Sequence, residues 1–392
     1  MKSDPRDAYR LKLLDPRWQK IRLKTFERDT WRCTNCGRMD RSLHVHHKQY
    51  TALEPWDEPM ENLVTVCVSC HADEHGLSVE VDEITSMIEA MPNTVCATRD
   101  LVLAAIGNIQ KMYDSPGAIT GIETGFSALD SMTDGMHPGE MIVVAARPSM
   151  GKTAFAMNIA EHVAINLGMP VAVFSLEMTA PQLTERILCS LARVNMGNIR
   201  LGFLSERDFP ALTAAASKLA HADLIIDDAP ALTIHEFGRR LRYYVKERGV
   251  KLAVVDYLQL LRSPTYRAST NRQVEIAEIS GSLKALAKEL GIPIIALAQL
   301  NRNVEGRGGE SKGRPRLSDL RDSGSIEQDA DVVLLLLREE YYAESDRERE
   351  SLSGKVTAII AKQRNGPVGD LPLIFIKEFL RFESRADAPE SS

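Results

Sequence analysis

The stretch "MIVVAARPSMGKTAFAMNIA", residues 141–160, decides the fold of most of this 392-residue chain. An apolar strand pattern leads into a tight loop, and a helical pattern follows directly. This is the P-loop arrangement, in which backbone N–H groups, here around Ser149 and Gly151, and a helix N-terminus bind phosphates. Lys152 would reach the β- and γ-phosphates, and Thr153 would hold Mg²⁺. The stretch therefore predicts a nucleoside triphosphate site.

Short apolar runs recur downstream of this loop, each bounded by polar or helical segments. The runs are "VAVFS" (171–175), "DLIID" (223–227), "KLAVVD" (251–256), "IPIIALAQ" (292–299) and "ADVVLLLL" (330–337). Continuous apolar runs of this length are typical of strands buried on both faces of a parallel sheet. We therefore expect an α/β domain over residues 119–385 with a mostly parallel twisted sheet.

Three polar residues stand where expected strands end. Asp256 closes "KLAVVD", where a carboxylate beside the P-loop holds Mg²⁺ through water. Glu177 comes directly after "VAVFSL" and could polarise an attacking water, and Gln299 could sense the γ-phosphate. On sequence position alone, Glu177 and Gln299 would more often be ordinary surface polar residues.

Ordered motifs extend from about Gly121 to Phe382. They are "TGFSALDSMTDGMHPGEMIVVAARPSMGKT", "SLEM", "VVDYLQLL", "AQLNR", "LSDLRDSGSIEQDAD" and "KQRNGPVG". The set resembles the C-terminal, RecA-like motor domain of the DnaB family of hexameric replicative helicases, in superfamily 4. The family commonly has Ala where Ala146 replaces the first Gly of the usual P-loop pattern.

This resemblance implies a homohexameric ring that uses ATP and Mg²⁺ to move on single-stranded DNA. It implies Glu177 as the catalytic base, Asp256 as the Walker B carboxylate and Gln299 as the γ-phosphate sensor. Lys362 and Arg364 in "KQRNG" would reach the ATP of the neighbouring subunit, which couples hydrolysis to the subunit interface.

Residues 301–324, "NRNVEGRGGESKGRPRLSDLRDSG", are rich in Gly, Arg and Lys and predict a flexible basic loop. In the resembling family such loops line the central pore, which implies that Arg321, Asp322 and Gly324 track the phosphates of one DNA strand. The alternative is a disordered surface loop.

The N-terminal region holds two CxxC pairs, Cys33/Cys36 and Cys67/Cys70. In a reducing compartment such pairs favour metal over disulfide, and four thiolates complete one tetrahedral zinc site. We therefore expect a structural Zn²⁺ in this region.

Histidines surround the cysteine pairs. His46 and His47 follow the strand-like run "SLHVH", while His71 and His75 lie four residues apart, one helical turn. One strand-borne and two helical imidazoles can converge on a cation, and His47, on the other side of the strand, is free to act as a general base. A plain zinc module with exposed histidines is the alternative.

The segment "RDTWRCTNCGR…LHVHHKQY…ENLVTVCVSCHADEH" resembles the HNH (ββα-metal) nuclease family, in the subtype stapled by four zinc-binding cysteines. The resemblance implies His47 as general base and His46, His71 and His75 as ligands of the catalytic metal, with Mg²⁺ as the default ion. It implies Asn62 as the residue that fixes the loop aiming the base. His44, on the same strand face as His46, is expected to be incidental.

Composition and charge set the outer limits. Residues 1–50 hold thirteen Lys/Arg against six Asp/Glu, an excess that could meet a polyanion or form a solvated face. The longest aliphatic run, Val332–Leu337, is far short of the ~20 residues needed to cross a bilayer, so we expect a cytoplasmic protein without membrane contact. The expected parts are a zinc-stapled nuclease domain (1–78), a linker with a helix (79–118), the motor domain (119–385) and a disordered tail (386–392).

The sequence thus predicts a ring-forming DNA helicase that carries a metal-dependent nuclease, in replication of a phage or mobile element or in defence against invading DNA. One alternative is a helicase whose zinc module binds DNA or a partner without cutting. Another is a recombinase-like ATPase that forms filaments, although "GSIEQDAD" and "KQRNGPVG" favour the helicase.

Overall fold

The computed structural model describes residues 15–37, 43–49, 54–68, 70, 71, 98, 117–263, 271–304, 313–320 and 324–384. The chain divides into two compact units, Met1–Ala97 and Thr98–Ser392. The expected linker helix after Thr98, and the tail from residue 386, lie outside the described residues. Within the described part of the chain, no helix is both long and apolar enough to span a bilayer.

The N-terminal unit is built on a short hairpin and one helix. Its elements are α2 (Pro16–Arg28), β1 (Leu43–His47), the 3₁₀ turn η1 (Met60–Asn62) and β2 (Leu63–Cys67). Strands β1 and β2 pair antiparallel, with Leu43 opposite Cys67 and His47 opposite Leu63. The carboxylate of Asp15 caps α2 by accepting from the Arg17 N–H at 2.8 Å.

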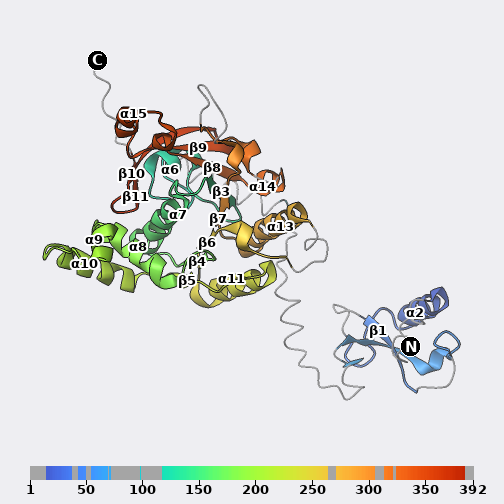
Figure 1. The fold of residues 1–392 in the computed structure, drawn as a ribbon. Helices are drawn as coiled ribbons and strands as arrows, with labels where there is room; N and C mark the ends of the chain where they lie inside the picture. Colours follow the sequence, from blue (N-terminus) through green and yellow to red (C-terminus); the bar gives the residue numbers. More distant parts are fainter. Residues whose placement is uncertain are drawn as a thin grey trace, which may run out of the picture. The chain divides into compact units, whose positions relative to one another are not determined.

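A nine-stranded sheet forms the centre of the second unit (Figure 1). In spatial order its strands are β11 (Arg381–Ser384), β10 (Gly369–Ile376), β9 (Lys355–Gln363), β8 (Val332–Leu337), β3 (Met141–Ala146), β7 (Ile294–Gln299), β6 (Leu252–Asp256), β4 (Val171–Ser175) and β5 (Leu224–Asp227). Strands β8 to β5 pair in parallel, and β9, β10 and β11 extend the sheet antiparallel. The predicted mostly parallel α/β fold is confirmed.

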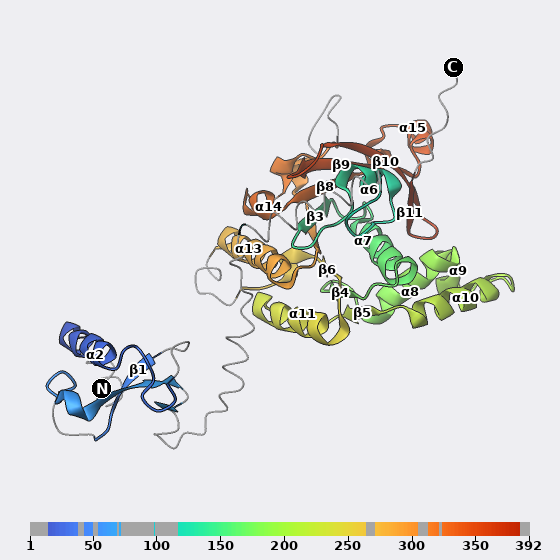
Figure 2. The same ribbon diagram turned by 180° about the vertical axis from the view of Figure 1, so that it is seen from behind.

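Helices cover both faces of this sheet (Figures 1 and 2). The helices described in this unit are α6 (Ser127–Thr133), α7 (Lys152–Glu161), α8 (Ala180–Ala192), α9 (Met196–Leu201), α10 (Asp208–His221), α11 (Ile234–Arg248), α13 (Arg272–Leu290), α14 (Gly324–Asp329) and α15 (Asp346–Ser351). One core joins a sheet face to α7 and α8 through Phe155 and Leu183, and the other joins the opposite face to α11 and α13 through Phe237 and Leu283. Strands such as β3 and β6 are buried along their whole length because both faces are covered.

Part of the basic segment 301–324, for which the composition predicts a flexible loop, forms regular turns. Arg302–Val304 and Leu317–Asp319 form 3₁₀ turns, and Leu300 pairs with Leu320 in a short antiparallel bridge. Leu320 is buried, which anchors the segment to the core. Residues 305–312 and 321–323 lie outside the described residues, and with them the DNA-tracking candidates Arg321 and Asp322.

Candidate nucleotide site and candidate metal centres

The P-loop connects β3 to α7 at the carboxyl edge of the parallel strands. β3 ends at Ala146 and α7 begins at Lys152. Ser149 (φ 67°) and Gly151 (φ 93°) both adopt left-handed backbone. A Cβ added to Gly151 would lie 2.9 Å from the Phe382 ring, so the loop needs glycine there for space as well as for conformation.

Three predicted side chains of this site meet directly. The Thr153 hydroxyl donates to Oδ2 of Asp256 at 2.7 Å, and Nζ of Lys152 lies 3.5 Å from Oδ1 of the same carboxylate. Asp256 is almost fully buried. Burial lowers the pKa of Lys152, against the charges of Asp256 and Glu177, which raise it. A hydroxyl and a carboxylate 2.7 Å apart are the oxygen pair expected to hold Mg²⁺ beside bound phosphates.

Glu177 and Gln299 line the same cavity, whose volume is about 670 Å³. Gln299 lies opposite Ala146 in the β3–β7 pairing. Ser175, two residues before Glu177, lies opposite Asp256 in the β4–β6 pairing. The sheet register thus brings the ends of four strands to one edge, which is where ligands bind in open α/β sheets.

Two further residues line this cavity that no sequence motif predicted, Arg338 and Tyr341. Nη1 of Arg338 and the hydroxyl of Tyr341 both donate to the carbonyl oxygen of Ser149, at 3.1 and 3.2 Å. Arg338 is 2% exposed, and its guanidinium stacks over Phe375, 4.6 Å from the ring centre. The one signal in the sequence was an arginine directly after the apolar run of β8.

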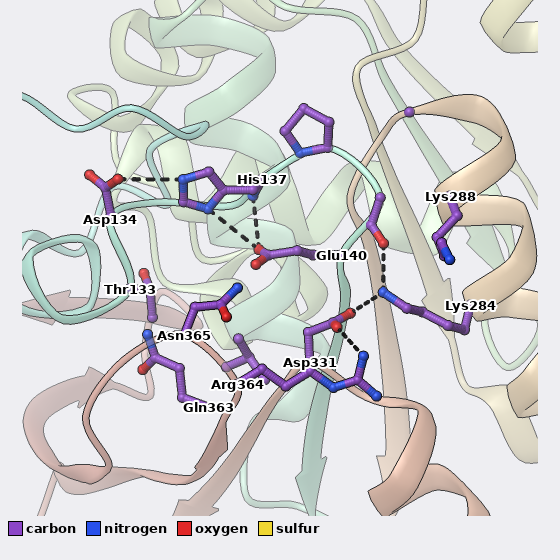
Figure 3. Close-up of a pocket in the computed structure, with 14 residues that line it drawn as sticks. Thr133, Asp134, His137, Glu140, Lys284, Lys288, Asp331, Gln363, Arg364 and Asn365 are labelled. Carbon is purple, nitrogen blue, oxygen red and sulfur yellow. Dashed lines mark hydrogen bonds and ion pairs between the residues drawn. The ribbon is translucent and has the colours of Figure 1, made fainter. Parts of the chain in front are cut away.

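Lys362 and Arg364 lie at the opposite edge of the sheet. Gln363 of β9 pairs with Val332 of β8, which in turn pairs with Ile142 near the start of β3. The P-loop follows the other end of β3, roughly 13 Å away at ~3.3 Å per residue. Neither cation lines the P-loop cavity of its own chain, whereas Arg364 lines a second cavity at its own edge (Figure 3). Of the DNA-tracking candidates, Gly324 begins α14.

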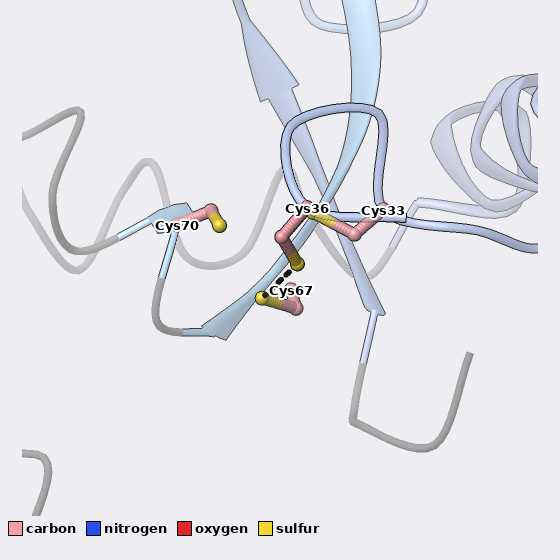
Figure 4. A group of neighbouring side chains, drawn as sticks. All are labelled: Cys33, Cys36, Cys67 and Cys70. Carbon is pink, nitrogen blue, oxygen red and sulfur yellow. Dashed lines mark hydrogen bonds between the residues drawn. The ribbon is translucent and has the colours of Figure 1, made fainter. Parts of the chain in front are cut away.

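The four predicted zinc ligands cluster in the N-terminal unit (Figure 4). The sulfur atoms of Cys33, Cys36, Cys67 and Cys70 all lie within 4.8 Å of one another. Those of Cys36 and Cys67 are 3.7 Å apart. Four thiolates at ~2.3 Å from a tetrahedral zinc lie roughly 3.8 Å from each other, so the cluster fits this ion. Burial raises the pKa of Cys33, but hydrogen bonds from the backbones of Cys36, Cys67 and Asn35 and from the Cys36 side chain together lower it to about 6, which favours the thiolate.

The histidines divide between the two sides of β1. The ring of His46 lies edge-on to His71, with centroids 5.1 Å apart, and His44 lies 5.5 Å from the same ring. His75 lies outside the described residues. Two of the three predicted ligands of the catalytic metal are therefore adjacent, and His44, expected to be incidental, lies beside them.

His47 points to the other side and stacks on Trp18, with ring centroids 5.4 Å apart and planes within 10° of parallel. Burial lowers the pKa of His47, against the charge of Glu58, which raises it. Asn62 holds the chain that follows His47, since its Oδ1 accepts from the Gln49 N–H at 2.9 Å and its Nδ2 donates to the Gln49 carbonyl at 2.7 Å. Trp18 had no signal in the sequence as a partner of the predicted base.

A P-loop on a mostly parallel sheet, with a buried carboxylate on a nearby strand, defines the second unit as a RecA-like P-loop domain. Residues 121–384 match the model of the DnaB-like helicase C-terminal domain, and residues 33–76 match that of the HNH endonuclease. The chain belongs to the DnaB-like helicase family and carries an HNH segment at its N-terminus.

Relatives of known function agree with this family. The replicative DNA helicase DnaB of Geobacillus stearothermophilus is 48% identical over 72% of this chain and 61% of that protein. The replicative DNA helicase DnaC of Bacillus subtilis is 46% identical over the same shares. The chain thus spans about three fifths of the length of these curated relatives.

Solved structures agree as well. One, of an isolated ATPase domain, superposes with a TM-score of 0.67 at 36% identity, over 73% of this chain and 99% of that one. Another, a DnaB-like replicative helicase determined to show its interactions with primase, gives 0.64 at 34% identity, over 78% of this chain and 71% of that one.

Proposed function

We propose that the chain is an ATP-driven, ring-forming DNA helicase that carries a metal-dependent HNH endonuclease. The observation that carries the motor is the contact of Lys152 and Thr153 with the buried Asp256 at the end of the P-loop cavity. The relatives support DNA as the substrate, because they are replicative DNA helicases.

In the motor, Lys152 and the P-loop N–H groups would bind the β- and γ-phosphates of ATP, and Thr153 with Asp256 would hold Mg²⁺. Mg²⁺ supplies charge neutralisation at the phosphates. Glu177 would orient the attacking water, and Gln299, beside Ala146, would register the γ-phosphate. Lys152, Thr153, Glu177 and Gln299 line the cavity where the bound phosphates are expected, and Asp256 contacts the first two.

The remoteness of Lys362 and Arg364 from their own P-loop supports a ring. A cation at the opposite sheet edge can complete an ATP site only on another subunit, which requires a heterologous, head-to-tail interface. We therefore propose a closed homohexamer with single-stranded DNA in its pore, where Gly324, Arg321 and Asp322 would track phosphates.

In the nuclease, His47 would take a proton from the attacking water, held in place by Trp18 and by the loop that Asn62 fixes. His46, His71 and His75 would hold a divalent cation, Mg²⁺ by default, which stabilises charge on the phosphate and leaving oxygen. The cysteine cluster would hold Zn²⁺ and keep β1 and β2 in place.

A second candidate is a helicase whose zinc module binds DNA without cutting. It is favoured by the cysteine cluster, because the sulfur atoms of Cys33, Cys36, Cys67 and Cys70 lie within 4.8 Å of one another and can hold a structural zinc without any histidine. Both versions would act on DNA in a bacterial or phage-infected cytoplasm, in replication or in defence.

ATP hydrolysis with and without single-stranded DNA tests the motor. We expect hydrolysis by the wild type and a loss of at least ~10³-fold in Lys152→Ala, because this lysine contacts the phosphates. Lys218→Ala, on the exposed side of α10, is the matched control. Equal rates in the wild type and in Lys152→Ala would reject the assignment of the P-loop.

A further inference from the structure

A second cavity, of about 660 Å³, opens at the sheet edge opposite the P-loop. Three cations line it, Arg364, Lys284 and Lys288, and Asp331 lies between the first two (Figure 3). Asp331 directly precedes β8, and it is 6% exposed. A carboxylate this buried is costly unless charges and hydrogen bonds satisfy it, so its partners define its role.

Both oxygens of Asp331 are occupied. Oδ1 lies 3.0 Å from Nη1 of Arg364. Oδ2 accepts from Nζ of Lys284 at 2.6 Å and from the backbone N–H of Met141 at 2.8 Å. The Arg364 N–H also donates to the Asp331 carbonyl at 2.9 Å. Asp331 is therefore fixed by β3 and α13 on one side and holds Arg364 on the other.

Arg364 keeps binding capacity while it is held. A guanidinium has five N–H donors. Two are committed, through Nη1 to Asp331 and through Nη2 to the Gln328 carbonyl at 2.8 Å, which leaves three. The side chain is 46% exposed. Such a group can remain on Asp331 and still donate two parallel hydrogen bonds to a phosphate.

Lys362, the other predicted trans-acting cation, is placed differently. An ammonium has three N–H donors. Its Nζ donates to three carbonyls at the end of α14, those of Glu327, Gln328 at 3.3 Å and Ala330 at 2.7 Å. Lys362 thus ties α14 to β9, and of the two predicted cations it is Arg364 that keeps donors for a ligand.

Lys284 sets the charge of the cluster. A pair of Asp331 with Arg364 alone would be neutral and would attract a phosphate weakly. With Lys284 also on the carboxylate at 2.6 Å, the three groups together carry one net positive charge. Because Arg364 is the more exposed cation, at 46% against 18%, that charge is presented through its guanidinium.

We propose that Asp331 is a positioning residue that aims the Arg364 guanidinium at the phosphates of ATP bound by the neighbouring subunit. Lys284 balances the negative charge of Asp331. This inference rests on the proposed trans-acting role of Arg364. Asp331 does not touch the nucleotide itself. It acts by fixing the direction of Arg364, and a displacement of ~1 Å at such a group costs about 10²-fold in rate.

Asp331→Asn tests the proposal in steady-state ATP hydrolysis by the assembled wild-type-length chain. We expect kcat to fall by about ten- to hundredfold while KM for ATP changes less than about twofold, because the variant's own P-loop is intact. Asp134→Asn is the matched control, since it makes the same change in the same cavity without touching Arg364. A raised KM with unchanged kcat, or wild-type values of both, would overturn the proposal.

Rings of mixed subunits distinguish a loss of Arg364 positioning from damage to the variant subunit's own fold. Lys152→Ala subunits cannot hydrolyse ATP but still present a normal Arg364. Mixed one to one with Asp331→Asn subunits, they should restore about a quarter of wild-type activity, since half the sites keep a P-loop lysine and half of those face a normal donor. Arg364→Ala subunits, mixed in the same way, calibrate the assay.

The two hypotheses fail differently. If Arg364→Ala alone keeps wild-type kcat, the trans-acting role of Arg364 is wrong, and the role of Asp331 falls with it. If Arg364→Ala is slow and is restored by mixing, while Asp331→Asn is slow and is not restored, Asp331 serves only the fold of its own subunit. The double variant should be no slower than Arg364→Ala, because both changes remove one function.

Discussion

At the scale of single residues, two side chains support the P-loop by donating hydrogen bonds to one backbone carbonyl, that of Ser149. Ser149 has left-handed backbone, which is unfavourable for a residue with a Cβ, and its carbonyl accepts from both Arg338 and Tyr341. These donors come from beyond β8, 189 and 192 residues along the chain. The loop conformation is therefore held by tertiary contacts between protein groups, which do not require a bound nucleotide.

Removing this support should weaken ATP binding without direct loss of a phosphate ligand. We expect Arg338→Met to raise the Kd for ATP by about tenfold or more, since a charged hydrogen bond of about 1.5–3 kcal/mol is lost. Tyr341→Phe removes one neutral hydrogen bond and should cost about threefold. Binding is measured with a fluorescent ATP analogue. Equal Kd values for the wild type and both variants would contradict the proposed support of the P-loop by Arg338 and Tyr341.

At the proposed nuclease site, the aromatic neighbour of His47 would have a comparable role. Trp18 is 4% exposed and lies parallel to the imidazole, so it fixes the plane of the predicted base. We expect Trp18→Leu to slow DNA cleavage by about tenfold or more, because the ring is no longer fixed. Trp18→Phe keeps a stacking ring and should retain most activity. Thermal unfolding of both variants controls for loss of the fold, and equal cleavage rates would reject the role of Trp18.

At the scale of elements, the cysteine cluster lies beside the β1–β2 hairpin, since Cys67 ends β2. The cluster of buried apolar side chains around the cysteines is small, with Cys33, Val66 and Cys67 as its buried members. A two-stranded hairpin is marginally stable by itself, so metal binding at the cysteines would supply much of its folding free energy.

Removal of zinc should therefore unfold one unit and spare the other. After treatment with a strong chelator, we expect amides of β1 and β2 to lose protection from hydrogen exchange, while β3 and β6 remain protected. Cys67→Ser should give the same pattern without chelator. Unchanged protection of β1 and β2 after verified loss of metal would show that the hairpin does not depend on zinc.

The sequence predicted the buried parallel strands and the P-loop because both are local patterns. It did not assign β9, β10 or β11, and β10 carries Pro372, which usually argues against a strand. Pro372 has no N–H to donate to a neighbouring strand. It lies opposite Thr357 of β9 on one side, and on the other side pairing with β11 begins only at Leu373, so no residue of β11 stands opposite it.

The same holds for the candidate sites: residues in short motifs were predictable from the sequence, and residues that depend on contacts between distant segments were not. Lys152, Thr153 and the four cysteines follow from spacing within short motifs. Arg338, Asp331 and Trp18 contact residues distant in sequence, as with Asp331 and Met141, 190 positions apart. Contacts of this kind depend on strand order and sheet register, which a single sequence does not reveal.

At the scale of the whole molecule, the P-loop and Arg364 lie at opposite ends of the parallel strands. Under the proposed trans-acting role of Arg364, a subunit with its P-loop at one edge and Arg364 at the other would have an incomplete ATP site when it is alone. We expect ATP hydrolysis per chain to fall on dilution, in step with dissociation of the ring followed by mass photometry. His47→Ala should show the same dependence, because it changes only the nuclease. Constant activity per chain across ring dissociation would contradict a site completed by a neighbour.

The most direct test of the central claim, a motor and a nuclease on one chain, is plasmid cleavage in Mg²⁺ or Mn²⁺ with and without ATP. Wild type, His47→Ala and Lys152→Ala are compared, and ATP hydrolysis is measured in the same samples. The account predicts that the wild type cuts, that His47→Ala hydrolyses ATP but does not cut, and that Lys152→Ala does not hydrolyse ATP. A wild type that hydrolyses ATP but cuts with neither metal, or a His47→Ala variant that cuts as well as the wild type, would contradict it.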